Sequence, residues 1–104
     1  MEAASWDTVG ELVKWLDRND ANSQETVRLL RILKIQEEAG EVAEAVHGAM
    51  GSNPRKGASH TWADVESELC DVILTAMVAL ATLTPDAEKA FRRHLAHVAD
   101  RSLN

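Results

Sequence analysis

The chain has 104 residues, of which 45% are hydrophobic, and a formal net charge of -6 at pH 7. This length fits one small domain, so we expect a single domain over residues 1–104. The acidic balance argues against binding to duplex nucleic acid or to an anionic membrane, because both require a basic surface. A single cysteine, Cys70, excludes an internal disulfide. With no signal-like or bilayer-length apolar segment, we expect a cytoplasmic protein.

Apolar residues recur at steps of three and four along the chain, which predicts an all-α fold. A first helix is expected to begin near Ser5 or Asp7 and to end near Asp17, where cap-forming polar residues predict a turn. One face of this helix is apolar and carries Trp6, Val9, Leu12, Val13 and Leu16.

The second predicted helix is the longest element, opening after Asn22 or Ser23 and running to about Met50. Apolar residues at steps of four and three define its expected core side: Ile35, Ala39, Val42, Val46 and Ala49. Residues 51–60, GSNPRKGASH, contain two glycines, two serines and a proline. This composition predicts a loop.

Thr61, followed three residues later by Asp64, predicts a capped start for a third helix that ends near Leu83. Thr84 and Pro85 are expected to cap and start a fourth. Its inward face is expected to carry Ala87, Phe91, Leu95 and Val98. The second half of the third helix is apolar on nearly every side, which four short helices can hardly cover, so we expect at least a dimer.

The second helix carries acidic residues beside its apolar side. With about 100° of rotation per residue, Glu38 and Glu41 lie about 60° and 120° from Ile35, on one shoulder of the core side. By the same count, Glu37 and Glu44 point to the opposite side and are expected to face water. The acids are therefore divided into a pair that borders the core and a pair that does not.

The third helix repeats this arrangement, because Glu68 and Asp71 share a shoulder of an otherwise apolar helix. An unpaired buried carboxylate is costly, so acids beside a core are retained where a cation satisfies them. Oxygen ligands suit a hard ion such as Mg²⁺, whereas the Glu-x-x-His step of di-iron bundles is absent, which disfavours iron or zinc. Acid pairs at this spacing are also common on solvated helix faces, so spacing alone leaves both interpretations open.

Two segments, EEAGEVAEA and ELCDVILTAMVALA, resemble the EExxE and ExxD signature of the MazG-like, all-α nucleoside triphosphate pyrophosphatase family. The match covers roughly residues 30–83. The resemblance implies a four-helix MazG-like bundle that forms homodimers or homotetramers and binds Mg²⁺, or in some members Mn²⁺. It also implies hydrolysis of a ribo- or deoxyribonucleoside triphosphate to the monophosphate and pyrophosphate.

Position by position, Glu38 and Glu41 match the ligand glutamates of the first family motif, and Glu68 and Asp71 match those of the second. Glu38 and Glu41 are also the candidate catalytic residues, since the chemistry needs a carboxylate that accepts a proton. Glu37 matches the leading glutamate of the first motif, but its outward direction argues against a ligand role.

Positive groups are expected to contact the outer phosphates of such a substrate. Arg31 and Lys34 share the acidic shoulder of the second helix, and Arg55 and Lys56 lie in the loop, where a plain solvated turn is the alternative. An aromatic residue, Trp62 or Phe91, could stack on the base or simply pack. Because no base-binding set is recognisable, a non-catalytic metal-binding or protein-interaction module of the same fold stays open as the alternative function.

Overall fold

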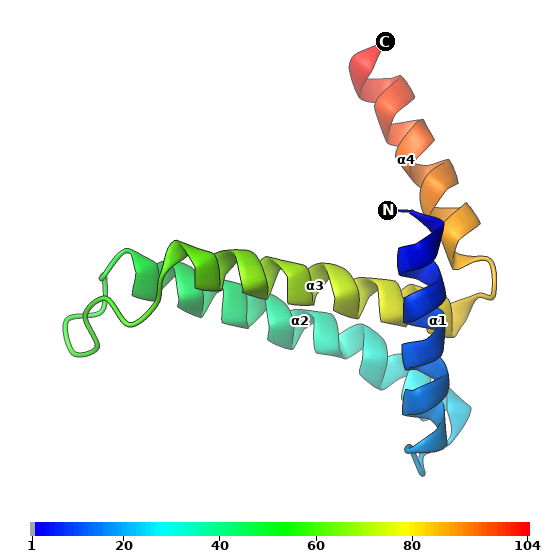
Figure 1. Cartoon of the computed structure of the whole chain (residues 1–104), viewed down its shortest axis with the longest axis horizontal. Coiled ribbons are helices and arrows are strands. Elements are labelled where there is room, and N and C mark those ends of the chain that lie inside the picture. Colours follow the sequence, from blue (N-terminus) through cyan, green and yellow to red (C-terminus); the bar gives the residue numbers. More distant parts are fainter. Residues whose placement is uncertain (1) are drawn as a thin grey trace.

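The computed structural model describes residues 2–104 and contains four helices: α1 (Ala3–Arg18), α2 (Gln24–Ala49), α3 (Trp62–Leu83) and α4 (Ala87–Leu103). No strand is formed within these residues, so the predicted all-α class is confirmed. Helices α2 and α3 lie side by side and antiparallel, joined by the loop at one end (Figure 1). Helix α1 crosses α3 near the C-terminal end of α3 (Figure 1).

The starts of α2 and α3 follow the capping signals of the sequence, whereas α4 begins at Ala87 after Asp86 and not at Thr84–Pro85 as predicted, because Thr84 ends α3. Ser23 Oγ accepts a hydrogen bond from the Thr26 amide at the start of α2. At the start of α3, the Thr61 amide donates to Asp64 Oδ2 (2.8 Å) and the Asp64 amide donates to Thr61 Oγ1 (3.2 Å). The hydrogen bond from the Thr61 backbone is the main cause that lowers the pKa of Asp64. These reciprocal bonds confirm the predicted capping pair.

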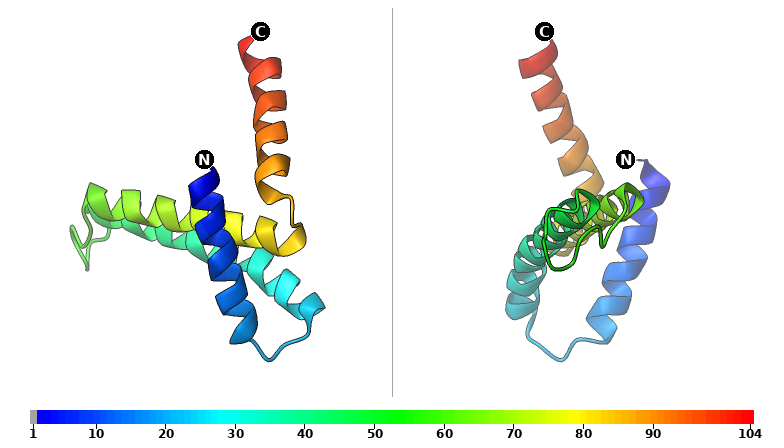
Figure 2. Two further views of the ribbon diagram at one scale, coloured as in Figure 1. Left: turned by 45° about the vertical axis from the view of Figure 1, so that its right-hand side comes forward. Right: turned by 90° about the vertical axis from the view of Figure 1, so that its left-hand side faces the viewer.

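The small core joins α1, α3 and α4. Trp6, Val9, Met77 and Ala87 are buried together, and Phe91 packs on Trp6 with 6.1 Å between ring centroids. Phe91 is therefore a packing residue, which decides between the two roles considered for it. The prediction that Leu95 faces inward is wrong: it is 51% exposed, because α4 leaves the other helices after its first turns (Figure 2).

The molecule is more extended than a compact domain of this length. Its radius of gyration is 16.6 Å, whereas about 13 Å is typical of a compact chain of roughly 100 residues. Helix α4 projects from one end of the α2–α3 pair (Figure 2). Contrary to our expectation, the described residues do not close into a four-helix bundle within one chain.

The buried face of α2 also differs from the prediction. Its buried residues are Val27, Arg31, Ala45 and Gly48, whereas Ala39, assigned to the core side, is exposed. Measured around the helix axis, the buried face is rotated by roughly 85° from the predicted one. The reason is that α2 packs on α3 along one side only, so apolar residues elsewhere on α2 stay uncovered.

Large apolar side chains are consequently exposed on both long helices. On α2 and α3 they are Leu29, Leu30, Ile32, Leu33, Trp62, Leu69, Ile73, Leu74 and Leu83. No single helix of residues 2–104 has the length and apolarity needed to cross a membrane, and α3 with α4 meets that criterion only as a pair bent by 117°.

Candidate metal centre

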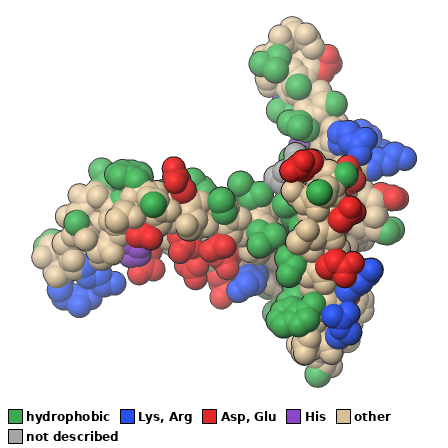
Figure 3. Space-filling view, in the orientation of Figure 1, with side chains coloured by type: hydrophobic (Ala, Val, Ile, Leu, Met, Phe, Trp, Pro, Cys, Tyr) green, Lys and Arg blue, Asp and Glu red, His purple; other side chains and the backbone are tan. Residues whose placement is uncertain are grey.

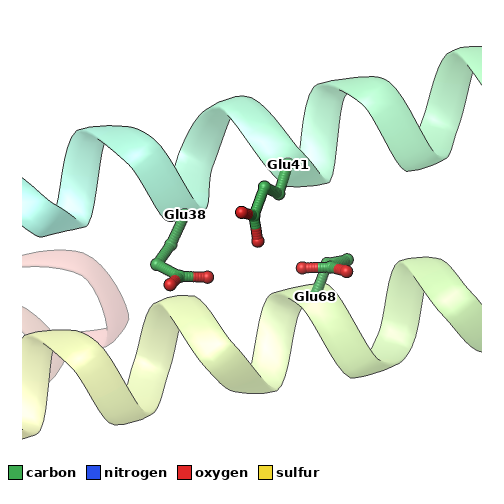
Figure 4. Close-up of side chains that lie close together, drawn as sticks. All are labelled: Glu38, Glu41 and Glu68. Carbon is green, nitrogen blue, oxygen red and sulfur yellow. The ribbon is translucent and has the colours of Figure 1, made fainter.

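Three carboxylates from two neighbouring helices converge midway along the α2–α3 pair. Glu38 and Glu41 lie one turn apart on α2, and Glu68 faces them from α3 (Figure 4). One carboxylate oxygen of each residue lies within 4.8 Å of the other two. Acidic groups gather along this part of the molecule, with basic groups at the loop end (Figure 3). The structure thus brings together three of the four predicted metal ligands.

Glu38 lies near the centre of the buried face of α2 and not on its edge, because that face is rotated from the predicted one. Its side chain is 13% exposed. Burial is the largest cause that raises the pKa of Glu38, followed by the negative charge of Glu41 and a hydrogen bond with that carboxyl group. Lys34 acts in the opposite direction, with Nζ at 3.7 Å from Glu38 Oε1. A further cation near Glu38 would therefore stabilise its ionised form.

Glu68 supplies a second sign of a cation site. Its Oε2 atom is buried and has no hydrogen-bond partner within residues 2–104. Buried polar atoms in proteins almost always have a partner, so this oxygen requires an explanation. A hard divalent cation fits the position, because such ions take oxygen ligands and the two nearest acidic groups offer further carboxylate oxygens. The residues present therefore fit Mg²⁺ or Mn²⁺.

Asp71, the fourth predicted ligand, lies outside the group of three. It is exposed, three residues beyond Glu68 on α3. Its charge still contributes to raising the pKa of Glu38, so it faces the same region. Asp71 would contribute to a metal site through a metal-bound water, since Mg²⁺ usually keeps several waters.

Arg31 occupies a different place from the one predicted. Its side chain is 10% exposed, and Nη1 lies 2.9 Å from Asp17 Oδ1 and donates a 3.0 Å hydrogen bond to Thr82 Oγ1. Arg31 therefore ties α2 to α1 and α3, whereas Lys34 is the predicted cation that borders the carboxylates. The sequence analysis missed this link between helices. The signal in the sequence was an arginine one turn after Val27, on the side of α2 that is buried.

The two loop cations, Arg55 and Lys56, are exposed at the far end of the α2–α3 pair. Their backbone amides donate to Asn53 Oδ1 at 2.9 and 3.0 Å, which defines a tight turn. Lys56 Nζ lies 4.0 Å from Glu44 Oε1. Glu44 is 62% exposed and Glu37 is also exposed, which confirms the outward direction predicted for both.

Two further side chains on α3, those of Cys70 and Trp62, are exposed to solvent. Trp62, the first residue of α3, is 58% exposed and therefore free to contact a ligand or a partner. Comparisons with protein-family models, curated proteins and solved structures gave no significant match.

Proposed function

We propose that the chain is a Mg²⁺-dependent nucleoside triphosphate pyrophosphohydrolase of the MazG-like type. It would convert a ribo- or deoxyribonucleoside triphosphate and water to the monophosphate and pyrophosphate. The observation that supports this most is the convergence of Glu38, Glu41 and Glu68, one of them with a buried oxygen that lacks a partner. Carboxylate oxygens without histidine or cysteine favour Mg²⁺ over zinc or iron, and Mn²⁺ can replace it.

The three glutamates, with Asp71 beside them, would hold the ion. A Mg²⁺ ion held there would supply positive charge that offsets the charge developing on the leaving pyrophosphate. In a family-like reaction, an oxygen of water attacks phosphorus while the anhydride bond to pyrophosphate breaks. We assign the proton that this water would lose to Glu38 or Glu41, two carboxylates of the cluster.

Lys34 is the cation best placed for the phosphates. Its side chain is 56% exposed and its ammonium lies 3.7 Å from Glu38, so it can turn toward a phosphate oxygen next to the metal ligands. Arg55 and Lys56 lie on the loop at the end of α2 and would reach only the outer part of a long substrate. We assign the main phosphate contact to Lys34.

We further propose that the enzyme acts as a homodimer or homotetramer. The exposed side chains of Leu29, Ile32, Leu33 and Leu69 support this, because water-exposed apolar surface favours association. The extended shape supports it too, since a second chain could cover the faces that one chain leaves open. A free exposed Cys70 fits a reducing compartment, and on this basis we place the protein in the cytoplasm.

The second candidate function is a non-catalytic module that binds a metal or another protein. It is favoured by the exposed apolar surface and by the finding that only one of the four predicted phosphate-binding cations borders the carboxylates. Steady turnover of any nucleotide would exclude this alternative.

The test is a panel of nucleoside triphosphates assayed for pyrophosphate release with Mg²⁺ and with a chelator. We expect Mg²⁺-dependent turnover of at least one nucleotide, lost in Glu41→Gln and Glu68→Gln while circular dichroism shows intact helices. Glu44→Gln is the matched control, because this exposed acid lies on the same helix but outside the cluster. A folded wild type that releases no pyrophosphate from any nucleotide would contradict the proposal.

A further inference from the structure

A second feature lies beside the carboxylates: residues of helices α1, α2 and α3 line an open pocket of about 350 Å³. Half of its ten lining residues are leucines and a valine. The other lining residues are Trp15, Asp20, Arg31, Lys34 and Thr75. A mostly apolar pocket with a few convergent polar groups is typical of small-molecule sites.

The pocket lies on the side of the candidate metal site that faces α1. Lys34 precedes Glu38 by one turn of α2, and Thr75 follows Asp71 by one turn of α3. Because the two helices are antiparallel, both steps lead in the same direction, toward α1 (Figure 1). With a rise of about 1.5 Å per residue, Lys34 lies about 6 Å along α2 from Glu38, and Thr75 lies about 10 Å along α3 from Glu68.

The polar groups of the pocket point to a planar ligand that carries hydrogen-bonding atoms. Trp15 is 54% exposed at the rim, so its indole ring is available for stacking. The Arg31 side chain is nine-tenths buried, and its Nη2 atom has no hydrogen-bond partner within the described part of the chain. Asp20 uses Oδ1 to accept the Asn22 amide at 2.8 Å, which holds its carboxylate in place.

We propose that this pocket binds the nucleoside part of a nucleotide whose phosphates lie at Glu38, Glu41 and Glu68, with the base stacked on Trp15. This assignment rests on the proposed function. A nucleotide joins a planar base to a chain of phosphates, and the structure places an aromatic, largely apolar pocket one turn from a cluster suited to a phosphate-bound cation. Lys34 lines both regions and would contact the phosphate nearest the sugar.

Trp62, the other exposed tryptophan, gives the matched control. It is 58% exposed, close to the 54% of Trp15, but it precedes Glu68 by six residues and so lies toward the loop, on the side opposite to the pocket. Removing either ring takes away a mostly solvated side chain, so both alanine variants should fold.

The experiment is a titration with nucleoside 5′-monophosphates in the presence of a chelator, so that no metal is required. In the wild type, the indole N–H resonance of Trp15 should shift with a nucleoside monophosphate and should not shift with ribose 5-phosphate, which lacks the base. By calorimetry, Trp15→Ala should weaken binding roughly fivefold or more, as expected for a lost base–aromatic stack, whereas Trp62→Ala should bind like the wild type.

Three results would overturn the assignment. They are an equal shift of Trp15 with ribose 5-phosphate, unchanged affinity in Trp15→Ala, and no response of Trp15 because a second copy of the chain covers it. The pocket and the catalytic proposal can fail separately. Monophosphate binding at Trp15 without any triphosphate hydrolysis would reject only the catalysis, whereas hydrolysis with an unchanged KM in Trp15→Ala would reject only the pocket.

Discussion

Asp17→Asn should destabilise the chain more than Arg31→Met, although the two substitutions remove the same ion pair. The side chain of Arg31 is 10% exposed, whereas that of Asp17 is 45% exposed. Asparagine at position 17 leaves a buried guanidinium whose remaining partner is the Thr82 hydroxyl. Methionine at position 31 fills similar space and leaves a carboxylate that water can reach. The asymmetry follows from which member of the pair is desolvated.

Removing one partner of a fully buried pair costs about 3–5 kcal/mol. Because Asp17 is almost half exposed, its contribution is screened, and we expect about 2 kcal/mol for Asp17→Asn. For Arg31→Met we expect less than about 1 kcal/mol. A domain of this size loses about 4–8 °C in Tm per kcal/mol, so Asp17→Asn should lower Tm by about 8–16 °C.

Thermal unfolding followed by far-ultraviolet circular dichroism measures both changes. Glu11→Gln is the control on the same helix, because the pair of Glu11 with Lys14 spans 3.6 Å between side chains that are 75% and 69% exposed. Its loss should cost less than about 0.5 kcal/mol. If Arg31→Met proves as destabilising as Asp17→Asn, the role given to the buried guanidinium is refuted.

Three further predictions concern the two long helices. Saturating Mg²⁺ should raise the Tm of the wild type and of Glu44→Gln but not that of Glu68→Gln. The reason is that a ligand present at a hundred times its Kd stabilises the folded protein by about 2.7 kcal/mol. Equal Tm shifts in all three proteins would contradict a metal site at the carboxylate cluster. Because the pKa of Glu38 is raised above 4.5, its ionised form opposes folding at neutral pH, and this penalty fades below pH 4.5. Without metal, Glu38→Gln should therefore have a higher Tm than the wild type at pH 7, and this difference should shrink as the pH falls. A lower Tm of Glu38→Gln at pH 7 would contradict the destabilising role of the Glu38 charge. In urea unfolding, Gly48→Ala should cost about 1–3 kcal/mol, since its methyl group would overlap loop side chains. Gly40→Ala, which meets open space, should gain up to about 1 kcal/mol, and equal effects would exclude the overlap.

The helix limits were readable from the sequence because capping is local. Ser23 and the Thr61–Asp64 pair act within one turn, and both signals place the start of a helix correctly. The first helix begins at Ala3, slightly before the predicted Ser5, with no side-chain cap. Where a cap is missing, the sequence holds no comparable local signal.

The buried face of α2 could not be read in the same way. Apolar spacing favoured the side of Ile35 and Ala39, but the side that packs on α3 is the one with Arg31 and Ala45. Which apolar stripe is covered depends on contacts between residues far apart in sequence, such as the 51-residue separation of Arg31 and Thr82. An uncovered apolar stripe looks the same in sequence as a buried one.

The candidate site also combines features set by local spacing with features set by the packing of helices against one another. The spacing of Glu38 and Glu41 on one helix is local, and it selected the two α2 residues that lie in the three-carboxylate group. Whether Glu68 or Asp71 completes the group depends on the rotation of α3 against α2, which periodicity does not determine. The pocket at Trp15 depends on how α1 crosses the helix pair, and no motif in the sequence predicted it.

Binding of Mn²⁺ followed by electron paramagnetic resonance tests the central claim most directly, because the signal of free aqueous Mn²⁺ falls when the ion binds. We predict that the wild-type protein lowers this signal, that Mg²⁺ restores it by competition, and that Glu68→Gln no longer lowers it while Glu44→Gln still does. An undiminished signal with folded wild-type protein, or equal binding by Glu68→Gln, would contradict a divalent metal site at Glu38, Glu41 and Glu68.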